Sequence, residues 1–436
     1  MKRSEKISYG MARLGSSILM NTVDFVTVLI YIEIFRLEPL YTGIATAIAK
    51  IVIAITQFLA GYFSDKTMTR FGKRKPYIIV GAPLTGISYV LLYSPQILNI
   101  PVSMLFGWLL FFDSLYHIGY GILTTPYQAW LPEITETPEE RLEVSAYQNT
   151  ANILATFIGT LGTFLLPDIA GTPLLVVVIG VFALVEIAFY IPTLIVIKEK
   201  EPKISEVSLS RVWEDIKHMA KNRDFVIWLF VQGTASLGII LLSSVMLGYV
   251  RLVLHLSGIT YYAAAMCLVV VVILSFILWK KLAKRKGNKK ALTIALIYSA
   301  AILLLIYPLG VTAGPTFETQ ILGVIYVAFI SVGLGGWYLF PYAIVADIAR
   351  ADEQQTGYEL CGLFTGFPSI PLNAFQAVGL VLTGFLLGLP PVDGYSAGYL
   401  YWGFVAAAFL TLANIILQKG VFEYNVNAQN ATAESH

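Results

Sequence analysis

Four side chains that can carry or accept charge lie deep inside apolar stretches of this 436-residue sequence. Asp24, Lys50 and Asp113 each stand about nine to twelve residues into their stretch, and His117 follows Asp113 by four residues. If these stretches are helices that cross a membrane, a rise of 1.5 Å per residue puts the three charges near the same depth, about 15 Å. An ionisable group at that depth costs several kcal/mol and is usually retained because it faces a cavity.

Two acids and one base at one level predict a coupling or gating network. One of the two carboxylates would hold a proton, because a dry setting and a neighbouring like charge disfavour a second negative charge. His117 lies one helical turn from Asp113 and is placed to relay a proton. The alternatives are a structural polar cluster that fixes helix packing and, for His117, a hydrogen-bonded packing role.

The composition indicates that the chain is a membrane protein. Hydrophobic residues make up 57% and charged residues 13%, whereas about a quarter of a soluble chain is charged. Apolar runs of about 20 residues or more, long enough to span a bilayer, recur along the whole chain, and continuous runs exclude a β-barrel. We predict an all-α protein with twelve spans, at 14–36, 41–64, 76–95, 101–127, 147–167, 173–197, 224–254, 260–283, 291–311, 318–346, 359–388 and 394–418.

Basic residues concentrate in alternate loops. The runs DKTMTRFGKRK (65–75) and KKLAKRKGNKK (280–290) would lie on the same side as the start of the chain, and the loops of the opposite side contain few basic residues. Positive charge gathers on the cytoplasmic side of membrane proteins. We therefore expect a multi-pass protein of the cell membrane with both termini in the cytoplasm. The first apolar run contains Asn21 and Asp24 and no small-residue cleavage site, so we expect it to be retained.

One long polar stretch divides six spans from six. We predict an N-terminal half at 1–197, a cytoplasmic linker with an amphipathic helix at 198–223, a C-terminal half at 224–418 and a tail at 419–436. The two largest basic loops occupy matching places in the halves. A duplicated six-span unit around a central cavity is the architecture of the major facilitator transporters.

Polar side chains form stripes at helical spacing that would line such a cavity. Amides both donate and accept hydrogen bonds, which suits the hydroxyl groups of a sugar, although small polar residues also bond between membrane helices. Glu186 belongs to no stripe, and we expect it to snorkel or to pair. The candidate substrate-binding residues are Ser17, Asn21, Thr124, Gln128, Gln148, Asn152 and Asn373.

Four motifs in order along the chain carry a resemblance to a known family. They are KISYGMARLGS near the start, GYFSDKTMTRFGKRKP (61–76), TTPYQAWLPEITETPEERLEVSAYQ (124–148) and PYAIVADIARADEQQTGYELCGLFTG (341–366). Together they resemble the glycoside–pentoside–hexuronide:cation symporter family, to which melibiose permease belongs. The resemblance implies a sugar-type transporter of the major facilitator fold.

The departures from that family lie at its functional charges. Its two second-span carboxylates, which bind the coupling cation, correspond to Ile53 and Gln57, and of its charges in the spans only a second-span base persists, as Lys50. Gln57 therefore joins the predicted network as an amide, which is a weaker cation ligand. The other family positions correspond to Ser17 for the span-one aspartate, Thr124 and Gln128 for the span-four aspartate and tryptophan, Gln148 for the span-five arginine and about Asn373 for the span-eleven lysine.

These patterns predict a secondary active transporter that moves a sugar or glycoside across the cell membrane by alternating access, coupled to protons in preference to sodium. Its partners would be a small-molecule substrate and the lipid bilayer, not nucleic acid. We expect no enzyme activity, cofactor or metal site. Alternatives are a carrier of a non-sugar metabolite or amphiphile, and a transporter-like sensor without flux. The family's loop pattern implies gate contacts in the outward-open state from Gly61, Asp65, Arg70, Lys73 and Arg74.

Overall fold

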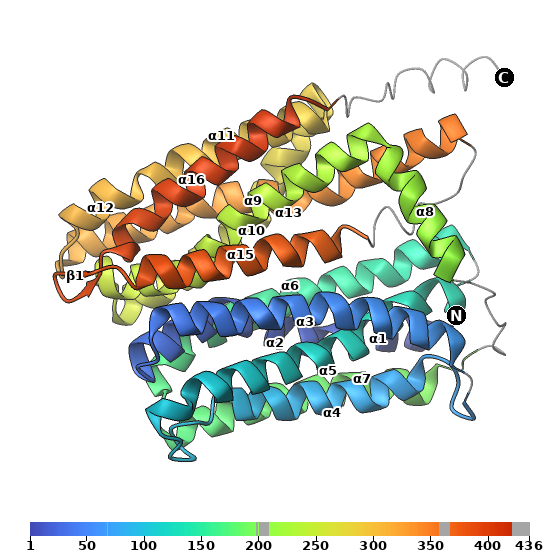
Figure 1. Cartoon of the computed structure of the whole chain (residues 1–436), viewed down its shortest axis with the longest axis horizontal. Coiled ribbons are helices and arrows are strands. Elements are labelled where there is room, and N and C mark those ends of the chain that lie inside the picture. Colours follow the sequence, from blue (N-terminus) through green and yellow to red (C-terminus); the bar gives the residue numbers. More distant parts are fainter. Residues whose placement is uncertain (68, 136, 198, 200–208, 357–366, 421–436) are drawn as a thin grey trace.

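The computed structural model describes all residues except 68, 136, 198, 200–208, 357–366 and 421–436. Within that part, twelve helices are long and apolar enough to cross a membrane, so the prediction of twelve spans is confirmed. The helices form two halves that lie side by side in Figure 1, with α1 to α7 in one and α9 to α16 in the other. The predicted fold, two six-helix halves, is therefore correct.

The bounds of the elements show where each half begins and ends. In the first half they are α1 (Arg3–Met11), α2 (Arg13–Leu29), the π-helical turn η1 (Ile30–Ile34), α3 (Pro39–Lys66), α4 (Lys75–Leu92), the short helix η2 (Val102–Met104), α5 (Leu105–Ile134), α6 (Pro138–Ile169) and α7 (Pro173–Val196). Helix α8 (Leu209–Lys221) follows in the predicted linker. In the second half they are α9 (Arg223–Gly248), the π-helical turn η3 (Tyr249–Val253), α10 (Gly258–Lys286), α11 (Asn288–Leu304), α12 (Ile306–Thr312), α13 (Phe317–Thr356), α15 (Ser369–Leu387), the two-residue strands β1 (Pro391–Val392) and β2 (Tyr395–Ser396), and α16 (Gly398–Leu417).

Local sequence explains where several helices begin. Proline at the first helical position starts α3, α6 and α7, because its missing N–H is not needed there. Thr137 and Asn222 cap α6 and α9 with side-chain oxygens that accept hydrogen bonds from backbone N–H groups in the first turn, as such residues commonly do.

Several predicted span boundaries differ from the structure because apolar content marks the membrane-buried part of a helix and not the whole helix. The first span was predicted from residue 14, but helix begins at Arg3, with a break at Ala12 between α1 and α2. Helix α13 runs to Thr356, ten residues past the predicted end, through a polar segment. The eleventh span begins at Ser369 in the described part of the chain, and residues 359–366 of its prediction lie outside that part.

The first span of each half ends in the same way, which supports a duplicated unit. The π-helical turns η1 and η3 each cover five residues, and the second residue after each has positive φ, Arg36 at 65° and His255 at 52°. The backbone hydrogen bonds match as well, since Phe35 N–H donates to Ile30 and Leu254 N–H donates to Tyr249. π-helical turns are rare and often occur at functional sites.

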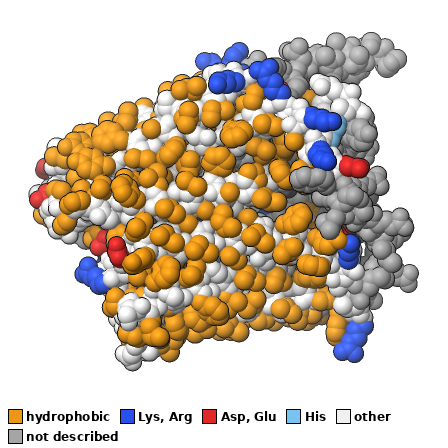
Figure 2. All heavy atoms as spheres, in the orientation of Figure 1, with side chains coloured by type: hydrophobic (Ala, Val, Ile, Leu, Met, Phe, Trp, Pro, Cys, Tyr) orange, Lys and Arg blue, Asp and Glu red, His pale blue; other side chains and the backbone are white. Residues whose placement is uncertain are grey.

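The surface separates into an apolar middle and two polar ends. In Figure 2 hydrophobic side chains cover the central part of the visible face, and most lysine and arginine side chains lie toward one end. We call this the basic end; it holds residues 65–67 and 69–75, α8, residues 280–290 and also the N-terminus (Figure 1). The opposite end holds η1, η3, β1 and β2. A belt of this kind is what a bilayer requires.

Candidate functional site

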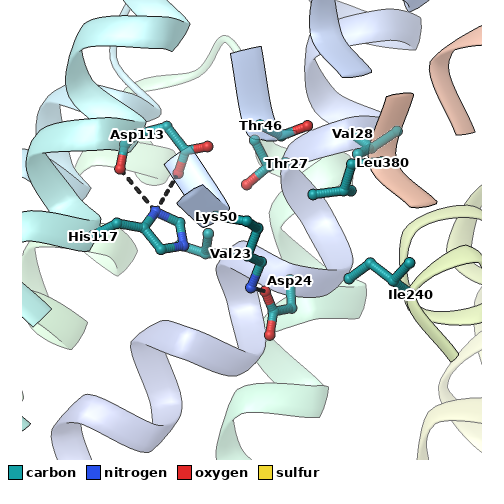
Figure 3. Close-up of a pocket in the computed structure, with 10 residues that line it drawn as sticks. All are labelled: Val23, Asp24, Thr27, Val28, Thr46, Lys50, Asp113, His117, Ile240 and Leu380. Atoms are coloured by element: carbon teal, nitrogen blue, oxygen red, sulfur yellow. Dashed lines mark hydrogen bonds and ion pairs between the residues drawn. The ribbon is translucent and has the colours of Figure 1, made fainter. Parts of the chain in front are cut away.

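The predicted charged residues come together around one small cavity between the halves. Its volume is about 20 Å³ for the centre of a water molecule, enough for about one ordered water. Figure 3 shows that Asp24 and Lys50 lie on one side and Asp113 and His117 on the other. The remaining lining residues are Val23, Thr27, Val28 and Thr46 from the first half and Ile240 and Leu380 from the second.

Asp24 and Lys50 form a direct ion pair across α2 and α3. The Nζ of Lys50 lies 2.7 Å from Oδ1 of Asp24. The Lys50 side chain is 5% exposed, whereas that of Asp24 is 26% exposed. The lysine is therefore held inside the protein, and the carboxylate forms the side of the pair that solvent or a substrate can reach.

Asp113 and His117 form a second pair within one turn of α5, and both are buried. The Nδ1 of His117 lies 3.1 Å from Oδ1 of Asp113 and 2.8 Å from the Asp113 backbone oxygen. Because two oxygens face Nδ1, that nitrogen carries a hydrogen. The Nε2 atom has no hydrogen-bond partner in the described part of the protein, so in the neutral ring it is an unused hydrogen-bond acceptor.

The predicted substrate-binding residues differ in how far they reach solvent. Gln128 and Asn152 are exposed, and Asn21, Gln148 and Asn373 are half-buried. The Nε2 of Gln148 donates to the hydroxyl of Tyr127 at 3.1 Å. Exposed amides in the interior of membrane-spanning helices line an aqueous space more favourably than lipid.

The other predicted polar residues are turned toward their own helices or buried. Thr124 is buried and donates to the Tyr120 carbonyl oxygen at 2.8 Å, and Asn373 donates to the Ser369 carbonyl oxygen at 2.8 Å. Ser17 is buried on α2, and Gln57 is half-buried on α3. In this state the hydrogen-bonding capacity of Thr124 and Asn373 is partly used by the backbone.

Arg13 was not identified from the sequence, whereas Tyr338 was left as a candidate either for the cavity or for the aromatic belt at the membrane interface. Arg13 lies four residues before Ser17 on α2 and hydrogen-bonds to the Tyr120 side chain. It continues the stripe of Ser17 and Asp24, and the signal was lost because the span was taken to begin at residue 14. Tyr338 on α13 is exposed and lies within electrostatic reach of Asp24, so it brings an aromatic ring from the second half toward the ion pair.

The predicted gating loop makes its ion pairs inside the first half. Arg74 is 3% exposed and pairs with Asp65 and Glu133, both at 2.5 Å, and Lys73 lies 3.5 Å and 3.3 Å from the same two carboxylates. Burial lowers the pKa of Arg74, but the hydrogen bond and charge of Glu133 and the charge of Asp65 outweigh it, so the pKa is raised. Arg70 is exposed and stacks on Phe71, while Gly61 lies against Thr125 of α5.

We expect Arg74→Met to destabilise the protein strongly and Arg70→Met to have little effect. The first change removes the buried guanidinium from Asp65 and Glu133 and leaves them only the longer contacts with Lys73, at 3.5 Å and 3.3 Å; losing hydrogen bonds to charged groups costs about 1.5–3 kcal/mol. The second removes a surface contact of one arginine. Thermal unfolding of the two purified variants checks this, and equal melting temperatures would contradict the role given to Arg74.

At the opposite end the two halves are joined by polar contacts. Arg251 of η3 pairs with Asp168 of α6 at 2.7 Å, and the Tyr399 hydroxyl donates to Glu33 of η1 at 3.0 Å. Each contact uses a residue from one of the two π-helical turns. These contacts could not be predicted from the sequence, because Glu33 and Arg251 stand at span ends, where charged residues are common.

Comparisons with known proteins agree with this architecture. The family described as MFS/sugar transport protein matches residues 8–398. The isoprimeverose transporter of Lactiplantibacillus pentosus is 21% identical over 410 residues, which cover 91% of this chain and 81% of that one. The inner membrane symporter YicJ of Escherichia coli (strain K12) is 30% identical over 162 residues, 37% of this chain and 34% of that one.

Solved structures support the fold. The xylose transporter XylE from E. coli, in an inward open conformation, has a TM-score of 0.63 and 14% identity, covering 97% of this chain and 95% of that one. A bacterial homologue of the iron transporter ferroportin, in an inward-facing state, has a TM-score of 0.67 and 14% identity, covering 96% and 99%. The chain therefore belongs to the MFS/sugar transport protein family, in line with its resemblance to the glycoside–pentoside–hexuronide:cation symporters, and it is a multi-pass secondary transporter and not an enzyme.

Proposed function

We propose that the protein is a proton-coupled carrier that moves a sugar or glycoside across the cell membrane, with its basic end and both termini in the cytoplasm. The orientation follows the location of lysine and arginine at that end. The carrier would be inward-facing in the present state, because the polar contacts Arg251–Asp168 and Tyr399–Glu33 close the opposite end while interior amides such as Asn152 are exposed.

The proposal rests on two pairs of residues, Lys50 with Asp24 and His117 with Asp113, that line one cavity. Lys50 is bonded to Asp24, and Asp113 lines the same cavity as a second carboxylate. Protonation of Asp24 would neutralise it and free Lys50 to turn toward Asp113. A cycle in which one lysine exchanges between two acids needs a proton and no metal ion.

Sodium coupling has less support. The family's two cation-binding carboxylates correspond to Ile53 and Gln57 here, and Ile53 is buried. An amide oxygen is a dipole end and a poorer ligand for a hard cation than a carboxylate. Groups of three or more histidine, cysteine or acidic residues that could hold a metal are also missing from the part of the chain that the structure describes.

A sugar class of substrate fits the exposed and half-buried amides of α5 and α6. Gln128, Gln148 and Asn152 offer both donors and acceptors, and Tyr338 offers an exposed ring. The isoprimeverose transporter, which is similar along 91% of this chain, is named for a sugar-type substrate.

The direct test is thermal unfolding of the purified carrier with pentoses, hexoses, disaccharides and hexuronates, each with and without sodium and at two pH values. A ligand at a hundredfold excess over its Kd stabilises the folded state by about 2.7 kcal/mol. We expect one sugar class to raise the melting temperature in a manner that changes with pH and not with sodium. A shift that requires sodium would refute the coupling, and no shift with any sugar would refute the substrate class.

We also expect Gln148→Ala to weaken substrate binding by about tenfold, the loss expected for about one or two net hydrogen bonds. Thr150→Ala is the matched control on the same helix, because the Thr150 hydroxyl donates to its own backbone at Ala146. Titration of both variants with the sugar that stabilises the carrier gives the two Kd values. Unchanged affinity in Gln148→Ala would assign that residue to packing alone.

A further inference from the structure

Glu186 is a carboxylic acid in the middle of α7 that has no visible partner. It is 0% exposed, and neither carboxyl oxygen has a hydrogen-bond partner in the described part of the protein. The sequence suggested that it would snorkel or pair. It does neither, since its position halfway along a membrane-spanning helix leaves both ends of the bilayer out of reach.

The backbone of α2 packs directly against Glu186 at Gly15. A Cβ atom added at Gly15 would lie 2.3 Å from the Glu186 Cα and 2.9 Å from its Oε2. Any side chain at residue 15 would therefore collide with Glu186. The absence of a side chain at Gly15 is what lets α2 and α7 close over the acid.

The charge of Glu186 reaches three tyrosines. Its charge acts on Tyr116 and Tyr120 of α5 and on Tyr190 of its own helix. The Tyr190 hydroxyl already lies 3.1 Å from the Ser16 hydroxyl. From α4, Gly86 packs beside Ala183 on α7, and Tyr89 lies 6.3 Å from Tyr116 between ring centres.

Two charged groups of α2 border this set. Arg13 is bonded to Tyr120, and Asp24 is paired with Lys50 but acts electrostatically on Tyr116 and Tyr120. Neither forms an ion pair with Glu186 among the described residues. An ionised carboxylate that is buried without a partner is too costly to persist, so the acid in this state is neutral and carries a proton.

We propose that Glu186 is a second proton-binding site of the carrier, occupied when the opposite end is closed and emptied when α2 shifts on α7. Gly15 lies in α2, three residues after the helix break at Ala12 that separates α1 from α2, so α2 can shift on α7 as a unit without carrying α1 with it. The same movement would carry Arg13, two residues from Gly15, to where its guanidinium can pair with the carboxylate. The site stands on its own geometry and does not depend on coupling through Asp24.

The protonation of Glu186 sets the direction in which pH shifts the carrier. Protonated Glu186 fits the closed opposite end, so raising the pH removes the proton and shifts the carrier toward opening that end. Glutamine has the shape of the neutral acid and cannot lose a proton. Glu186→Gln should therefore stay closed at the opposite end over the whole pH range.

Two measurements test the site in the full-length carrier reconstituted in lipid nanodiscs. Infrared spectroscopy should detect the carbonyl stretch of a protonated carboxylic acid that is lost in Glu186→Gln and kept in Asp24→Asn. Spin labels at Leu98→Cys and Phe317→Cys, exposed positions at the opposite end of the two halves, should move apart as the pH rises in the otherwise unchanged protein. The same labels in Glu186→Gln should keep one distance.

A band that survives in Glu186→Gln, or an equal pH dependence of the label distance in both proteins, would overturn the proposal. If Glu186→Gln does not fold, Glu186→Met keeps a neutral side chain of similar size for the same comparison. If both fail to fold, the pH dependence of the acid band in a carrier with isotope-labelled glutamate decides, because absence of a protonated glutamate band excludes the site. The proton-coupling proposal is tested separately by sugar accumulation in Asp24→Asn.

Discussion

Asp24→Asn is expected to abolish concentrative sugar uptake while leaving sugar exchange across the membrane. The substitution keeps the shape of the side chain and removes the charge that accepts from Lys50 at 2.7 Å. Exchange needs only substrate binding and the conformational change, whereas accumulation needs the proton. We therefore expect accumulation ratios in proteoliposomes to fall to about one under an imposed proton gradient.

The energetic reason is the position of Lys50. Its side chain is 5% exposed, and an unpaired lysine at the centre of a membrane helix costs about 2.5–3.5 kcal/mol. Without Asp24, the second carboxylate on the same cavity is Asp113. The lysine would then stay with Asp113, and the exchange of partners that couples the proton to the conformational change would stop.

Asp347→Asn is the matched control for this experiment. Asp347 lies on α13, where it accepts a hydrogen bond from Asn288 at 3.0 Å, and it does not line the cavity. It should retain accumulation. Full accumulation by Asp24→Asn, with normal expression, would disprove proton coupling through this residue and leave its ion pair a structural role.

Some features of the structure could be predicted from the sequence and others could not, because a sequence pattern reports burial in lipid or the face of a helix but not contacts between helices. Apolar runs report burial in lipid, so the twelve spans were found, and intramembrane charges are rare enough that Asp24, Lys50 and Asp113 were located at one level. Arg13 was missed because the first span was taken to begin at residue 14, one residue after it. The sequence could not predict which charged residues form ion pairs, because helical spacing places residues on one face of a helix but does not decide which other helix that face contacts.

The environment of Glu186 could not be predicted from the sequence either. A single acid outside any polar stripe shows no helical pattern, and the burial of Glu186 depends on Gly15 of another helix. The two residues are 171 positions apart in the sequence, and neither segment contains a pattern that predicts their contact. The same is true of Arg251 and Asp168, whose contact exists only because the two halves close on each other at one end.

Gly384→Val is expected to trap the carrier with its opposite end open and to stop net transport. Helices α3 and α15 cross backbone to backbone near that end. A Cβ atom at Gly384 would lie 2.6 Å from the Pro39 carbonyl oxygen and 3.1 Å from the Gly43 Cα. Both neighbours are backbone atoms, which cannot rotate away as a side chain can, so the two halves would have to separate there.

Spin labels at Leu98→Cys and Phe317→Cys should then report a long distance at every pH, and uptake should fall by at least about tenfold, which corresponds to about 1.4 kcal/mol against the closed state. Gly180→Val is the matched control, because nothing lies within 4 Å of an added Cβ at that position of α7. It should fold and transport normally.

Gly43 and Gly384 face each other, so a substitution at either one tests whether this crossing is a gate or a packing contact that is present in every state. A Cβ at Gly43 would lie 2.5 Å from the Leu380 carbonyl oxygen and 3.0 Å from the Gly384 Cα, so Gly43→Val should reproduce the trapped state. If Gly384→Val instead melts at a much lower temperature with the label distance unchanged, the crossing holds the fold together in every state. If the distance lengthens and the melting temperature is kept, the crossing is made only when the opposite end closes, as alternating access requires.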